Sequence, residues 1–290
     1  MIADDVDAFE RKMQGHRTDI EVQRAGCRAL DRKFGHWAVN HSLLKDNRVQ
    51  RSVEQACRAV VEGMRVHAKK HIVQEAGTAV LQCLQIDGPL REPAWKAGAL
   101  TAVANAMRSF AASPSVQKNG CNFVYHLFYA HEHWQPACDR LEQAIESHSL
   151  PVDLIVTAMR AHPDAQEDAC DALTVILKYG HWATIETAIR EGVLDVLAAR
   201  NDYHPEHSPL HFKAAVVLEC IVTYEGKTAV RQALLQATRL DQANQIKAAG
   251  RRWLRAVYDD NSHIHRFFSD LGEALDALTM IPEEESTGYG

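Results

Sequence analysis

The feature that most constrains the fold of this 290-residue chain is an internal repeat. A nine-residue pattern, seen as VQRAGCRAL at 22–30, returns with a small residue at its centre. The further copies lie at 73–81, 116–124, 165–173, 210–218 and 246–254. Their central residues are Gly26, Gly77, Gly120, Ala169, Ala214 and Gly250. The mean period of about 45 residues is typical of arrays of stacked helical units.

A second motif keeps step with the first. Met-Arg occurs at 64–65, 107–108 and 159–160, in each case 10 to 13 residues before a central small residue. Each copy ends a segment whose apolar residues recur with helical spacing, and GVLDVLAAR at 192–200 is a fourth copy without the methionine. No segment alternates with the period of two that a strand requires. The pattern therefore predicts helices throughout.

Gly-His-Trp-Ala, at 35–38 and again at 180–183, is a third marker of the period. Its place predicts a helix that is centred on the small residue and ended by the glycine. A short helix opened by the tryptophan follows, and then a longer helix that ends in Met-Arg. A packing role explains the His-Trp pair better than a catalytic role, because an amphipathic indole suits a helix junction. The stretch 86–98 is predicted to be an irregular loop.

Three helices in about 45 residues, with a small residue early in the first, resemble the armadillo repeat. The nearest copy of a divergent form of that repeat is AMRAHPDAQEDACDAL at 158–173. The resemblance implies an all-α, right-handed α-solenoid of about five to six repeats with helical end caps. The expected divisions are an N-terminal cap helix or tail at 1–20, a repeat domain at 21–258, a capping helix at 259–281 and an acidic tail at 282–290.

Composition and charge exclude several classes of protein. Seven scattered cysteines without a C-x-x-C pair indicate reduced thiols, not a disulfide framework. A net charge of −6 is unusual for a nucleic-acid-binding domain, so we expect no such partner. No apolar run approaches the roughly 18 residues of a membrane span. The first residues are acidic where a targeting peptide would be basic, so we expect a cytoplasmic protein with no membrane partner.

The chain carries none of the common catalytic or phosphate-binding motifs. Two histidine-rich stretches, HLFYAHEH at 126–133 and HPEHSPLH at 204–211, lack the tight ligand pairs of zinc sites. The sequence leaves open whether either stretch binds a metal. We therefore expect no catalytic residues, no cofactor and no small-molecule substrate.

The armadillo resemblance also implies a place for a partner. Armadillo families line a concave groove with the third helix of each repeat, and a set of arginines with one asparagine occupies matched places near the end of that helix. Guanidinium groups pair with carboxylates through two hydrogen bonds, which suits an acidic peptide, although the helix dipole also favours arginine in a last turn. The regular asparagines of the best-known armadillo peptide binders are missing. This arginine ladder consists of Arg65, Arg108, Arg160, Arg200 and Asn105.

These observations predict a protein-interaction scaffold or adaptor, not an enzyme. It is expected to bind a partner protein or an extended acidic peptide on the concave face. Two alternatives stay open from the sequence. One is a structural subunit of a larger assembly, such as a cytoskeletal or ciliary complex. The other is a helical-repeat enzyme or enzyme-associated factor.

Overall fold

The structure is a computed structural model that describes residues 2–37, 46–83, 91–129, 135–147, 149–180 and 182–199, together with 210, 213–214, 216–217 and 220–221. Gly250, the predicted capping helix at 259–281 and the predicted tail at 282–290 lie outside the described residues. The chain divides into two compact units, Met1–Ile176 and Leu177–Gly290, and each is described by itself.

Every regular element among the described residues is helical, which confirms the predicted all-α class. Most helices are amphipathic and bury one apolar stripe, as helical periodicity requires. The helices are α1 (Ile2–Gly15), α2 (Ile20–Trp37), α3 (Asn47–Val66), α4 (His71–Cys83), α5 (Arg91–Lys96), α6 (Ala99–Ser109), α7 (Pro114–Phe128), α8 (Gln135–Glu146), α9 (Val152–Ala161), α10 (Gln166–Tyr179), α11 (Trp182–Arg190) and α12 (Val193–Ala199), with a short 3-10 turn at Pro163–Ala165.

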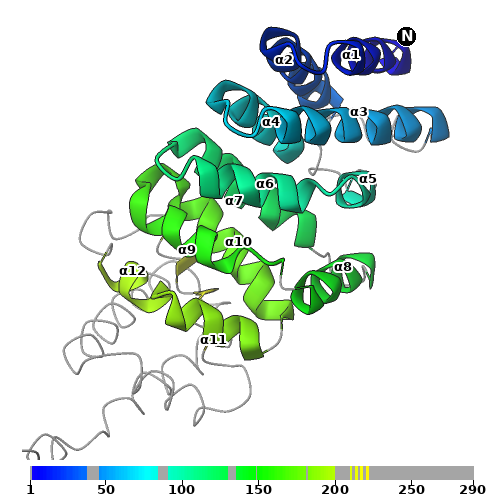
Figure 1. Ribbon diagram of the computed structural model, residues 1–290. Coiled ribbons are helices and arrows are strands. Elements are labelled where there is room, and N and C mark those ends of the chain that lie inside the picture. The colour runs from blue at the N-terminus through cyan, green and yellow to red at the C-terminus, as the bar shows by residue number, and fades with distance from the viewer. Residues whose placement is uncertain are drawn as a thin grey trace, which may run out of the picture. The chain divides into compact units, whose positions relative to one another are not determined.

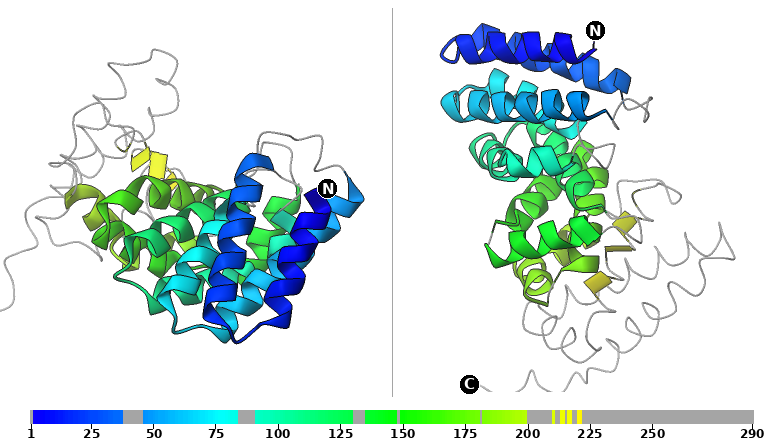
Figure 2. Two further views of the ribbon diagram at one scale, coloured as in Figure 1. Left: turned by 90° about the horizontal axis from the view of Figure 1, so that it is seen from above. Right: turned by 90° about the vertical axis from the view of Figure 1, so that its right-hand side faces the viewer.

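The helices of the first unit pack in two rows (Figures 1 and 2). Helix α4 packs on α2 and on α7, and we call α2, α4, α7 and the first turns of α10 the glycine row. Helices α1, α3, α6 and α9 form the methionine row. The pairs α1–α2, α3–α4 and α6–α7 join the rows, while the short helix α5 packs against both α3 and α6. In the second unit, α11 packs against α12.

Each repeat glycine of the glycine row lies against a methionine 13 residues earlier in the chain. A Cβ atom at Gly77 would lie 2.6 Å from Cγ of Met64, and a Cβ atom at Gly120 would lie 2.5 Å from Sδ of Met107. Both methionines are fully buried, as their flexible thioethers fill the gap beside the glycine. The repeat therefore needs a small residue because a methionine side chain occupies the space.

We call this contact, in which a methionine of one helix lies against a glycine of the next, a joint. A further joint occurs at the start of the chain. Met13 lies in the last turn of α1, which ends at Gly15, and its side chain occupies the space that a Cβ atom at Gly26 would need. This copy lacks the Met-Arg motif, because Gln14 replaces the arginine, and the sequence pattern therefore does not reveal it. Segment 1–20 thus contains a helix that joins α2 as α3 joins α4.

A buried glutamine fixes each of these joints. The side-chain amide of Gln74 donates hydrogen bonds to the carbonyls of Met64 at 2.7 Å and His67 at 3.1 Å. Met64 lies in the last turn of α3, where backbone acceptors have no partner within the helix, and His67 is the residue that follows that helix. The carbonyl of His67 also accepts a hydrogen bond from the Lys70 N–H at 2.9 Å. Gln23 makes the same pair of bonds to Met13 and His16, and Gln117 makes it to Met107 and Phe110. The glutamine of the repeat therefore satisfies the end of one helix from the start of the next.

Three local predictions differ from the structure. Helix α2 continues through Gly35 to Trp37, because a glycine in a last turn costs a helix only about 1 kcal/mol. The second copy follows the prediction, since α10 ends at Tyr179 and α11 begins at Trp182. The third helix is not always the longer one, since α8 has 12 residues and α9 has 10.

Part of the predicted loop at 86–98 is also helical. Residues 91–96 form α5, and Gly98 then takes a left-handed conformation with φ of 77° before α6 begins. Buried Arg91 donates a hydrogen bond to the backbone carbonyl of Tyr129, at the end of α7. A contact with a distant part of the chain therefore stabilises this helix, and local sequence does not reveal it.

Candidate partner-binding surface

The predicted arginine ladder begins at the end of α3. Arg65 is exposed and forms a two-bond ion pair with Glu62, with Nε–Oε2 and Nη2–Oε1 distances of 2.8 Å. This hydrogen-bonded pair lowers the pKa of Glu62 and raises the pKa of Arg65. Because the carboxylate of Glu62 already binds its guanidinium, Arg65 is less available to bind a carboxylate of a partner.

The other described members of the ladder lie at equivalent helix ends. Nη1 of Arg108 donates to Oδ1 of Asn105 at 3.2 Å, so these two candidates bind each other. Arg160 is exposed at the end of α9, and Arg200 lies outside the described residues. The described members of the ladder therefore all belong to the methionine row.

The glycine row presents a second surface, which the sequence analysis did not identify. In each of its helices the residues two before, two after and five after the central small residue are exposed or half-buried. These positions share one helix face, while most of the apolar positions between them are buried. We call this surface the row face. It consists of Arg24, Arg28 and Asp31 in α2, Glu75, Ala79 and Gln82 in α4, Lys118, Asn122 and Tyr125 in α7, and Glu167, Asp171 and Thr174 in α10.

Two hydrogen bonds join neighbouring helices at this surface. Sγ of Cys83 donates to Oδ1 of Asp31 at 3.0 Å, and burial raises the pKa of Cys83 to about 12, so the thiol keeps its proton. Nδ2 of Asn122 donates to Oδ1 of Asp168 at 2.7 Å. Each bond connects two helices of the row, so the side chains around it are held in place before any partner binds.

The row face is aromatic on α7. The ring centroids of Tyr125 and His126 lie 4.9 Å apart, and those of Tyr125 and Tyr129 lie 5.0 Å apart. Burial raises the pKa of Tyr125 to about 12, and burial together with the charge of Arg91 lowers the pKa of His126 to about 4. Both side chains are therefore neutral at pH 7. Half-exposed tyrosines of this kind dominate binding at many protein interfaces.

Comparison with known proteins agrees with this two-row geometry. A sequence profile described as the LRRK2 ARM repeat matches residues 5–283. The chain belongs to the LRRK2 ARM repeat family. Among solved structures, it is similar to the crystal structure of an engineered protein, with a TM-score of 0.62 and 17% identity over 88% of this chain and 97% of that chain. It is also similar to a designed armadillo repeat protein, with a TM-score of 0.60 and 16% identity over 86% of this chain and 98% of that chain. These likenesses show an armadillo fold.

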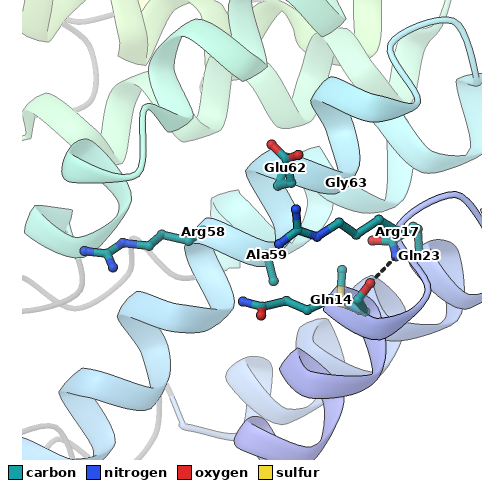
Figure 3. Close-up of a pocket in the computed structure, with 8 residues that line it drawn as sticks. Gln14, Arg17, Gln23, Arg58, Ala59, Glu62 and Gly63 are labelled. Atoms are coloured by element: carbon teal, nitrogen blue, oxygen red, sulfur yellow. Dashed lines mark hydrogen bonds between the residues drawn. The ribbon is translucent and has the colours of Figure 1, made fainter.

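The first joint of this armadillo repeat chain holds a polar pocket of about 360 Å³ (Figure 3). Arg17 reaches over it toward Glu62, and its charge contributes to the lowered pKa of that carboxyl. Gln23 and Gly63 also line the pocket, and a Cβ atom at Gly63 would lie 2.6 Å from Oε1 of Gln23. Since Gln23 in this lining binds the carbonyls of Met13 and His16, we assign the pocket to the joint between α1 and α2.

The histidine-rich stretches of this armadillo repeat chain are only partly described. Residues 130–134 of the first lie outside the described residues, and so does all of 204–211 except Leu210. Within the part of the chain that the structure describes, no three histidine, cysteine, aspartate or glutamate side chains gather closely enough to hold a metal ion. Across that same part, no helix is both long and apolar enough to cross a membrane.

Proposed function

We propose that the chain is a protein-interaction scaffold that binds an extended segment of a partner protein across the row face. The observation that carries this proposal is that the same three positions are exposed or half-buried on each of α2, α4, α7 and α10, beside a buried apolar core. The armadillo fold supports it, because such folds commonly serve as interaction scaffolds. The proposed activity is equilibrium binding without a chemical step.

The side chains of the row face suit a peptide backbone. Gln82 and Asn122 each offer amide groups that can pair with main-chain donors and acceptors. Tyr125 offers a rigid aromatic surface next to them, and such residues often dominate the energy of an interface. A partner segment would therefore gain polar and apolar contacts on neighbouring helices.

The arginine ladder is the second candidate surface, for an acidic peptide. Arg108 and Arg160 support it, because both are exposed at matched ends of α6 and α9. The two surfaces lie on different rows of helices, so one experiment can separate them.

The test is site-specific photo-cross-linking in cell lysate. A photoreactive amino acid is introduced at Ala79, in the middle of the row face, and in separate variants at Arg108 and at Gln55. We expect cross-linked partner proteins from position 79 and none from position 55, which is exposed on α3. Circular dichroism first establishes that the three variants are equally folded.

Cross-links from position 108 and none from position 79 would reject the row face in favour of the arginine ladder. A double variant, Arg108→Glu/Arg160→Glu, provides an independent check. If this variant loses the partner that wild-type protein captures, the row face does not suffice for binding. If it captures the partner as well as wild type does, the ladder is not required.

A further inference from the structure

One register of the row face carries opposite charges at its two ends, whereas the register two residues before the small residue alternates in sign. The register two residues after the central small residue contains Arg28 in α2, Ala79 in α4, Asn122 in α7 and Asp171 in α10. This register therefore passes from a cation through two uncharged residues to an anion. A partner that crosses all four helices meets these charges in a set order.

At the α2 end, two guanidinium groups are available. Arg28 and Arg32 are exposed and lie one helical turn apart, and the described part of the chain supplies neither with a hydrogen bond or an ion pair. Arg24 is already paired with Glu21 at 2.7 Å, and Asp31 accepts the hydrogen bond from Cys83, so Arg28 and Arg32 leave the α2 end with a net positive charge. Arginine binds carboxylates through two parallel hydrogen bonds, so this end suits acidic residues.

At the α10 end, three acidic residues lie close together. Glu167, Asp168 and Asp171 lie on the first turns of α10, and Asp168 also binds Asn122. Asp171 acts on the Tyr125 hydroxyl, since its charge adds to the effect of burial in raising the pKa of that group. A carboxylate beside a half-exposed aromatic ring suits a lysine or arginine side chain, which gains an ion pair and a cation–π contact.

We infer that the row face binds a partner segment that carries acidic residues at its α2 end and a lysine or arginine at its α10 end. This inference rests on the proposed function and adds the chemistry of the partner. Neighbouring packed helices are about 8–10 Å apart, so three steps span roughly 25–30 Å. An extended chain of eight or nine residues covers that distance at about 3.3 Å per residue.

The order of charges also sets the direction of the segment. A segment bound in reverse would place its acidic end against Asp171 and its basic end against Arg28, and like charges brought together at an interface cost several kcal/mol. Repulsion from the wrong orientation therefore contributes as much to specificity as attraction in the right one.

The probe is a displayed library of random dodecapeptides, selected on the immobilised full chain. We expect enriched peptides to carry acidic and basic residues at opposite ends, six to nine residues apart. The affinity of such a peptide should fall at least tenfold in Arg28→Glu/Arg32→Glu and several-fold in Asp171→Lys. The matched control is Lys69→Glu/Lys70→Glu, which makes the same charge change at two exposed lysines between α3 and α4. This control should bind within twofold of wild type.

A charge swap completes the test. A peptide with lysine in place of its acidic residues should bind Arg28→Glu/Arg32→Glu better than it binds wild type. Enriched peptides that cross-link to position 79 but are insensitive to Arg28→Glu/Arg32→Glu would overturn the charge order and leave the proposed function standing. A selection that enriches no peptide would also overturn the charge order, while cross-linking at position 79 in lysate still decides the proposed function.

Discussion

At the scale of single residues, the contact between glycine and methionine is the strongest local constraint in the repeat. A side chain at Gly77 has to displace Met64, whereas a Cβ atom at Gly15, the last residue of α1, meets nothing within 4 Å. The two glycines therefore differ in their surroundings although both lie in helices. A close approach, and not an unusual backbone conformation, explains the repeat glycine.

Replacement of Gly77 by leucine should destabilise the protein by about 1–3 kcal/mol, the usual cost of overpacking a core. Gly15→Leu is the control, because it introduces the same side chain where a Cβ atom meets nothing within 4 Å. Urea unfolding followed by circular dichroism measures both. Equal free energies of unfolding for the two variants would contradict the role assigned to the methionine contact.

The pKa of His126 is lowered within a pH range in which the stability of the protein can be measured. Its folded pKa of about 4 lies below the unfolded value of 6.5, because burial and Arg91 disfavour the imidazolium. Between these values the unfolded chain binds more protons than the folded one. Stability from this group is therefore complete above about pH 6.5 and is lost as the pH falls toward 4, by at most about 3 kcal/mol.

The variant His126→Gln should remove this component of the pH dependence. Free energies of unfolding measured between pH 4 and pH 7.5 test the expectation. His16→Gln, at an exposed histidine of the first joint, should keep the wild-type profile. If both variants show the wild-type slope, His126 does not titrate with a lowered pKa in the folded protein.

At the scale of helices, the buried glutamines determine how one helix follows another. Gln74 reaches from the first turn of α4 to the carbonyl of Met64 in the last turn of α3, and to the carbonyl of His67, which also accepts a hydrogen bond from the Lys70 N–H. The bonds repeat at three joints, so the angle between paired helices is set in the same way each time. The regular rows follow from this repetition.

The substitution Gln74→Leu keeps the volume of the side chain and removes both hydrogen bonds. It should cost about 1–3 kcal/mol, because a buried acceptor without a partner retains its full desolvation cost. Gln55→Leu on the exposed side of α3 is the control and should change stability little. Thermal or urea unfolding distinguishes them, and a neutral Gln74→Leu would mean that the joint is held by apolar packing alone.

At the scale of the whole molecule, the packing of each helix on its neighbours in a row produces an extended surface. Each helix of the first unit packs mainly on its paired helix and on its neighbours in the row, as in other repeat proteins. Such stacking places equivalent registers of α2, α4, α7 and α10 side by side, although these helices are some 45 residues apart in sequence. Arg28 from α2 and Asp171 from α10 thereby become parts of one surface for a partner to meet.

Much of this architecture could be predicted from the sequence, because its causes are local and recur with each period. Helical spacing of apolar residues, Met64 ahead of Gly77 and the all-α armadillo class all follow from patterns within one repeat. The joint at Met13 and the helix at 91–96 could not be predicted in this way. At the joint, Gln14 stands in place of the expected arginine, and the helix at 91–96 depends on a contact between Arg91 and Tyr129.

By itself, the sequence determined the period, the helices and the residues that each joint requires. Only the tertiary structure decided which positions remain open once the helices are packed. It placed the described members of the arginine ladder on the methionine row, with Arg65 bound to Glu62, and it revealed the row face on the other row. The reason is physical: a helix pattern specifies which side is apolar, but the exposure, pairing and charge of its polar side depend on neighbours that come from distant repeats.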